Sequence, residues 1–204
     1  MNVILASGSP RRKDLLTQMG VSFTVVQSNY DEQLDSSRSP SEVANELALG
    51  KAQDVAARYA DALVIGADTI VTVDGEQLGK PESPEHATAM LQQLAGRAHD
   101  VTTGLALVCV AKGIEITHAD TTKVFFANYD ESAVTAYVAT GDPLDKAGAY
   151  GIQSLYGTLI TRVEGDIDTV MGLNTTSLAR LLTEQGIAAE PLTIKAENLA
   201  DYIV

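Results

Sequence analysis

The sequence predicts a mixed α/β fold, with a largely twisted β-sheet flanked by helices. Apolar runs of strand type alternate with segments whose apolar residues recur at helical spacing. Several strands follow one another through short turns, which a purely parallel sheet does not allow. The length of 204 residues suits one domain, or two small lobes around a shared cleft.

The first expected unit is a strand, a turn and a helix. Val3–Ala6 is a short apolar run of strand type. Ser9 can cap a helix, and Pro10 fits its first turn. The apolar face and the end of this helix come from Leu15, Leu16, Met19 and Gly20.

A second helix is expected over Ser41–Ala60, with Val43, Leu47 and Val55 on one face. Lys51 lies four residues from both Leu47 and Val55, so a cation interrupts this apolar face. We interpret Lys51 as a lysine at the edge of the face, with its ammonium group extended to solvent.

The rest of the chain alternates strands and helices. Ala62–Val73 is the most strand-like segment, and Asp74-Gly75 predicts a hairpin turn after it. Strands are also expected between the last two helices, around a turn at Glu164–Asp166. The last segment, Ile187–Val204, is acidic and weakly patterned, typical of an edge element or a loose tail. The other expected elements are a helix from Ser83 to Gly96, strands over Val101–Val110 and Ile116–Ala127, and helices near Glu131–Thr140 and Asn174–Gln185.

Composition excludes several functional classes. The 14 Lys and Arg against 27 Asp and Glu give a net charge of −13, which disfavours binding to nucleic acid or to anionic membranes. A small anionic ligand is compatible if the basic residues gather in one place. The single cysteine, Cys109, permits no internal disulfide, and the first residues lack a basic secretory leader. We therefore expect a cytoplasmic protein without nucleic-acid or membrane partners.

Common catalytic motifs are missing. The segment Gly75–Lys80 has three residues where a P-loop needs four, and Pro81 replaces the hydroxyl residue that holds magnesium. No G-x-G-x-x-G follows a strand, and G-x-S-x-G is absent. The three histidines lack the spacing of zinc ligands.

Charged residues occupy unusual places instead. Ser7–Arg12 sets two hydroxyl groups and two arginines at a helix N-terminus, where positive charge is unfavourable unless an anion such as phosphate binds there. The alternative is a capped helix with two solvated arginines. Asp68 ends an apolar run of strand type, where structural pairing with a cation is the commoner role and metal binding or catalysis are the others. Glu32 and Lys80, taken alone, are typical solvated loop residues.

The segment Asp145–Gln153 packs glycines and small residues around two charges and one amide. It has no amphipathic period, so it is a poor core element. Such composition favours a loop that lies close to a ligand.

Four motifs together resemble the Maf family of nucleoside triphosphate pyrophosphatases, which share a fold with the inosine triphosphate pyrophosphatases. The motifs are Ala6–Arg12, Gly66–Thr69, Gly79–Pro81 and Asp145–Gln153. Gly172-Leu173-Asn174 departs from the family's usual Gly-Leu-Pro, and we expect a local variant of a helix start there with no loss of activity. The resemblance implies two lobes around a central cleft, one domain over residues 1–186, and an acidic extension over 187–204.

The resemblance also implies hydrolysis of a nucleotide between its α- and β-phosphates, assisted by Mg²⁺ or Mn²⁺, and a homodimer. It assigns Asp68, Glu32 and Lys80 to catalysis, with Asp68 as proton acceptor and with Glu32 and Asp68 as metal ligands. Phosphate binding falls to Ser7, Arg12, Lys51 and Lys146. The residues at Arg11, Thr69 and Gln153 match the subgroup acting on dTTP and UTP, and a glutamine amide can pair with the uracil edge. The alternatives are a non-catalytic nucleotide-binding regulator of cell division or septum formation, and a phosphatase acting on monophosphates.

Overall fold

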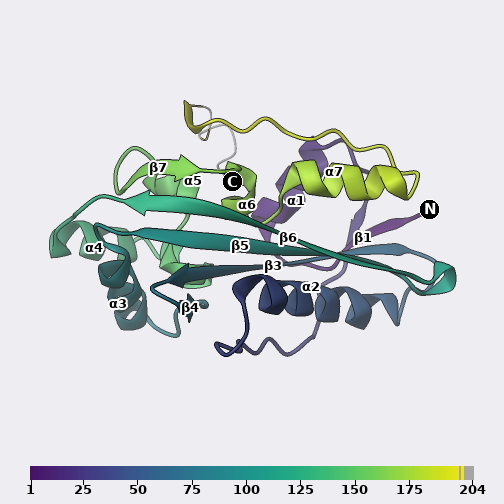
Figure 1. Cartoon of the computed structure of the whole chain (residues 1–204), viewed down its shortest axis with the longest axis horizontal. Helices are drawn as coiled ribbons and strands as arrows, with labels where there is room; N and C mark the ends of the chain where they lie inside the picture. Colours follow the sequence, from purple (N-terminus) through teal and green to yellow (C-terminus); the bar gives the residue numbers. More distant parts are fainter. Residues whose placement is uncertain (198, 200–204) are drawn as a thin grey trace.

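The computed structural model describes residues 1–197 and 199, in which a seven-stranded mixed sheet is flanked by helices (Figure 1). The strand order is β2-β1-β3-β5-β6-β7, and β4 pairs with β3. β1 is parallel to β2 and to β3, and the other pairs are antiparallel, which confirms the predicted mixed sheet. The strands are β1 (Val3–Leu5), β2 (Thr24–Val25), β3 (Leu63–Val73), β4 (Glu76–Leu78), β5 (Ala98–Cys109), β6 (Ile114–Phe126) and β7 (Ile160–Glu164).

The helices begin where the sequence places caps. The side chains of Ser9 and Ser83 accept hydrogen bonds from the first turns of α1 and α3, and α2 begins at a capping box between Ser39 and Glu42. No described helix is both long and apolar enough to cross a membrane. The helices are α1 (Pro10–Gln18), α2 (Pro40–Ala56), α3 (Pro84–Leu94), α4 (Glu131–Val138), α5 (Ile152–Leu155), α6 (Ile167–Met171) and α7 (Thr175–Glu184), and the 3₁₀ turns are η1 (Val110–Lys112), η2 (Asp142–Asp145) and η3 (Ala147–Ala149).

Two expectations for the C-terminal part are corrected. Between α4 and α7 the only described strand is β7, because Pro143 and the positive φ angles of Gly141, Gly148 and Ala149 interrupt an extended chain. After β7, Gly165 at φ 118° turns the chain directly into α6.

In its described part the C-terminal extension forms no strand, and it is not a loose tail. The backbone N–H of Glu190 donates to the carbonyl of Met19, and that of Leu192 donates to Thr175 Oγ1. Its partly buried apolar side chains pack on the core. Residues 198 and 200–204 of the expected extension lie outside the described residues.

Helix α2 lies unusually close to the middle of the sheet. A Cβ atom on Gly66 of β3 would lie 2.1 Å from the carbonyl oxygen of Ala48, and one on Gly104 of β5 would lie 2.3 Å from that of Ala44. Only glycine permits this approach of helix backbone to strand backbone. As a result, Lys51 on α2 reaches Asp68 on β3.

Candidate active site

A cavity of about 640 Å³ opens between the β1–α1 loop, α2, β3 and the segment that follows η2. The structure brings to it every side chain that the sequence analysis singled out, although these come from distant parts of the chain. They are Ser7, Arg11, Arg12, Glu32, Lys51, Asp68, Thr69, Lys80, Lys146 and Gln153. Their placement is therefore as expected, while the role of each one stays a prediction.

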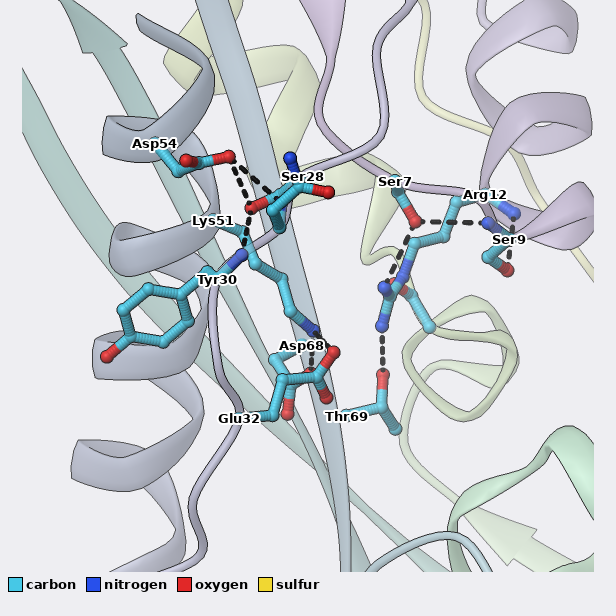
Figure 2. Close-up of polar contacts among 12 residues, drawn as sticks. Ser7, Ser9, Arg12, Ser28, Tyr30, Glu32, Lys51, Asp54, Asp68 and Thr69 are labelled. Carbon is cyan, nitrogen blue, oxygen red and sulfur yellow. Dashed lines mark hydrogen bonds and ion pairs between the residues drawn. The ribbon is translucent and has the colours of Figure 1, made fainter. Parts of the chain in front are cut away.

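Lys51 lies between two carboxylates at the centre of the cleft. Its Nζ is 2.5 Å from Asp68 Oδ1 and 2.9 Å from Glu32 Oε1 (Figure 2). The side chains of Lys51 and Asp68 are 10% and 9% exposed, so the ammonium does not extend to solvent. The interpretation of Lys51 as a solvated edge lysine is wrong, because two anions compensate its charge inside the protein.

Glu32 reaches this pair from an irregular segment that α2 holds in place. Asp54 Oδ2 accepts a hydrogen bond from Ser28 Oγ at 3.0 Å (Figure 2). It accepts a second one from the Asn29 N–H, also at 3.0 Å. The ring of Tyr30 occupies the space over Gly50, where a Cβ would come within 2.4 Å of it. Sequence reasoning missed this anchoring, although a glycine inside a helix was a usable signal.

Glu32 is ionised at neutral pH. Burial acts to raise the pKa of its carboxyl group, but the charge and hydrogen bond of Lys51 outweigh it, so the pKa lies below its usual value. Glu32 is 44% exposed, which leaves it open to the cleft. Glu32 is therefore not simply a solvated loop residue, because it forms an ion pair with Lys51 at the surface of the cleft.

Arg12 joins three segments with its guanidinium group. Its Nε donates to the carbonyl of Gly172 at 2.7 Å, Nη2 donates to Thr69 Oγ1 at 3.0 Å, and Nη1 donates to Ser7 Oγ at 3.3 Å (Figure 2). Burial lowers the pKa of Arg12, and the nearby charge of Asp68 opposes this shift. Within the described residues, no carboxylate forms an ion pair with Arg12. A fixed guanidinium without a direct counter-ion is suited to bind an anion.

Comparison with known proteins agrees with these motifs. The model of the family described as Maf-like protein matches residues 2–185. The chain belongs to the Maf family. It is 47% identical over 186 residues to the dTTP/UTP pyrophosphatase of Moorella thermoacetica, which covers 91% of this chain and 95% of that protein. It is 44% identical over 185 residues to the dTTP/UTP pyrophosphatase of Bacillus cereus, with 91% and 96% covered.

A solved structure supports the fold of this Maf-family chain. The Staphylococcus aureus Ham1 protein matches with a TM-score of 0.51 and 15% identity, over 91% of this chain and 100% of that one. At this identity the likeness concerns the fold alone, and it agrees with the expected architecture of a sheet flanked by helices.

The departure from the usual Maf motif forms the expected variant of a helix start. Asn174 caps α7 by accepting a hydrogen bond from the Ser177 N–H at 2.8 Å. Its amide group also donates to Thr169 Oγ1 at 2.9 Å and to Asp166 Oδ2 at 3.1 Å. Asn174 is thus the N-cap of α7, at the position where the family usually has proline.

Lys146 is paired within its own segment, whereas the carboxylate partners of Lys51 come from other segments of the chain. Its Nζ lies 2.7 Å from Asp145 Oδ1 and 2.9 Å from Asp142 Oδ1, and it donates to the Asp142 carbonyl. Two carboxylates of its own segment thus balance its charge. By contrast, Lys80 is exposed at the rim of the cleft.

A buried histidine, which sequence reasoning missed, lies behind the Asp145–Gln153 segment. His99 on β5 is 2% exposed, and its Nε2 is 2.7 Å from Tyr150 Oη. Burial lowers the pKa of His99 to about 4; the charge of Asp100 acts in the opposite direction, and that of Lys123 lowers it further. His99 is therefore neutral at pH 7. The sequence placed His99 between an expected helix and an expected strand that begins at Val101, so its burial in β5 was not predicted.

We expect this histidine to make folding stability depend on pH. The unfolded chain binds a proton near pH 6.5, whereas the folded chain binds it only near pH 4, so the free energy of unfolding falls as the pH is lowered between these values. At about 1.4 kcal/mol per unit, the loss totals about 3 kcal/mol. The free energy of unfolding is measured by urea titration at pH 4.5, 5.5 and 6.5. Its dependence on pH should be weaker for His99→Leu than for the wild type. The variant His86→Gln, at an exposed histidine, should keep the pH dependence of the wild type. An unchanged pH dependence in His99→Leu would show that His99 is not its source.

Proposed function

We propose that this chain hydrolyses dTTP and UTP between the α- and β-phosphates, releasing the nucleoside monophosphate and pyrophosphate. The observation that carries the proposal is one cleft in which two carboxylates face a fixed guanidinium that has no direct counter-ion. The names of relatives at 44–47% identity support the same activity.

Each group has a role that its position permits. Asp68 accepts a proton from the water whose oxygen attacks the α-phosphorus, and pyrophosphate leaves with the electron pair of the broken P–O bond. Arg12, Ser7 and Lys80 bind phosphate oxygens, and their positive charge stabilises the charge that develops there. Lys51 holds the two carboxylates close together before the nucleotide arrives.

The donor set fits a divalent cation. Among the residues that the structure describes, no group of three or more His, Cys, Asp or Glu side chains could hold a metal. Mg²⁺ is usually bound by one or two carboxylates together with substrate phosphates, and Asp68 and Glu32 supply two such carboxylates. When bound, Mg²⁺ or Mn²⁺ would neutralise phosphate charge.

A panel of nucleotides tests the function. UTP, dTTP, CTP, GTP and UMP are incubated with Mg²⁺ or Mn²⁺, and pyrophosphate and orthophosphate are measured separately. We expect metal-dependent pyrophosphate from UTP and dTTP. Binding without turnover would instead indicate a nucleotide-binding regulator of cell division, and orthophosphate from UMP would indicate a phosphatase. The proposal includes a homodimer and a cytoplasmic location, which the family resemblance and the single cysteine support.

Replacing Gln153 by alanine is expected to lower kcat/KM for UTP and dTTP about ten- to a hundredfold. A neutral amide adds little to phosphate binding, so its value lies in pairing with the pyrimidine edge; leaving that edge unpaired costs about 1–3 kcal/mol. The values for CTP and GTP should change much less. A uniform loss across all four nucleotides would show that Gln153 supports the loop or the phosphates.

A further inference from the structure

The wall of the cleft that carries Gln153 contains a strained turn next to the sheet. Gly148 and Ala149 both have positive φ angles, at 67° and 60°, and the Gly148 N–H donates to the Gly79 carbonyl at 3.0 Å. Alanine rarely adopts this conformation, which persists only where the surroundings hold it. The wall therefore needs fixed points on both sides of its strained turn.

One fixed point lies immediately after this turn. Tyr150 lines the cleft, and its hydroxyl group meets the imidazole of His99, which lies outside the cleft. Phe126 of β6 packs edge-on against both rings, at 5.1 Å from that of His99 and 4.9 Å from that of Tyr150. Tyr150 and His99 are 5% and 2% exposed, so water cannot replace their hydrogen bond.

Both partners are neutral at pH 7, because burial raises the pKa of Tyr150 well above its usual value as it lowers that of His99. Their hydrogen bond is thus a fixed neutral contact between β5 and the cleft wall. The next residue, Gly151, donates its N–H to Tyr137 Oη at 2.9 Å, and Gln153 follows in α5. Displacement of Tyr150 would move this short stretch of the wall.

We propose that His99 is a positioning residue for nucleobase selection, acting through Tyr150 on the stretch from Gly151 to Gln153. The inference rests on the proposed function, because it assigns this wall to the pyrimidine base. His99 itself touches no nucleotide. Its loss changes which base fits and leaves the contacts of Arg12 with Gly172, Thr69 and Ser7 in place.

The test compares kcat and KM for UTP and CTP in His99→Leu, Tyr150→Phe and the double variant. Tyr150→Phe removes one hydroxyl group and keeps the ring, so it tests the idea even if His99→Leu fails to fold. The matched control is Tyr129→Phe, which removes a half-buried hydroxyl group that is bonded to the Leu91 carbonyl and does not line the cleft.

We expect the preference for UTP over CTP to fall about tenfold in each single variant, through a higher KM for UTP with kcat within about twofold. The double variant should fall no further, because both changes break the same contact. Tyr129→Phe should lower only the melting temperature. An unchanged preference in both single variants, or additive losses in the double variant, would overturn the proposal. Absence of pyrophosphate release by the wild type would count against the proposed function instead.

Discussion

Replacing Asp68 by asparagine is expected to lower kcat for UTP about a thousandfold or more, with the fold retained. Asparagine keeps the shape of the side chain but removes its basicity and its affinity for a metal. Lys51 would keep Glu32 as its partner, so its ammonium would not be left without an anion. The measurement is pyrophosphate release under saturating UTP and Mg²⁺, with circular dichroism to confirm folding.

Asp100→Asn is the matched control for this change. Asp100 also pairs with a lysine, with Oδ1 2.6 Å from Lys123 Nζ, but its side chain is 44% exposed and lies outside the cleft. Its loss should leave kcat unchanged, because an exposed ion pair contributes little. Near-normal turnover of the Asp68 variant would exclude this carboxylate as the proton acceptor.

Replacing Arg12 by lysine is expected to lower kcat/KM about a hundredfold, by the same factor for UTP and dTTP. Lysine keeps the positive charge but cannot reach Gly172, Thr69 and Ser7 together, because it lacks the planar group with five donors. A group that contacts only phosphate cannot distinguish the bases, so the two nucleotides should suffer equally. Steady-state kinetics with both nucleotides measures this.

Arg180→Lys serves as the control. Arg180 is exposed and pairs with Glu184 within α7, so its replacement should change neither nucleotide's kinetics. A loss confined to one of the two nucleotides would move Arg12 from the phosphate site to the base pocket.

The sequence predicted the elements whose signals are local. Ser9, Ser83 and Asn174 marked helix starts correctly, and the long apolar run before Asp74 marked β3. These signals depend on a few adjacent residues, and capping and strand patterns read them directly. The prediction of strands between α4 and β7 was wrong, because the shape of this segment depends on backbone conformations that composition does not specify.

The sequence predicted which residues line the candidate site, but it did not predict how they contact one another. The motifs named the residues that line the cleft, yet Lys51 was misread, because its two carboxylate partners lie 17 and 19 positions away in the chain. The close packing of α2 on Gly66 and Gly104 brings Lys51 to Asp68. The attachment of residues 28–30 to α2 brings Glu32 to the same lysine. His99 escaped for the same reason, since its partner Tyr150 is 51 residues away.

The segment that carries Glu32 is attached to α2 by side-chain hydrogen bonds, so its local stability differs from the global stability of the fold. The hydrogen bonds that hold residues 28–30 go to the side chains of Asp54 and Ser28 and not to a neighbouring strand. Such a segment can open by a local fluctuation that costs far less than global unfolding. Opening carries Glu32 away from Asp68 while every strand stays paired. The fraction of molecules with a complete cleft therefore depends on the local opening of this segment and not on global unfolding. On heating, activity should be lost at a lower temperature than the sheet structure.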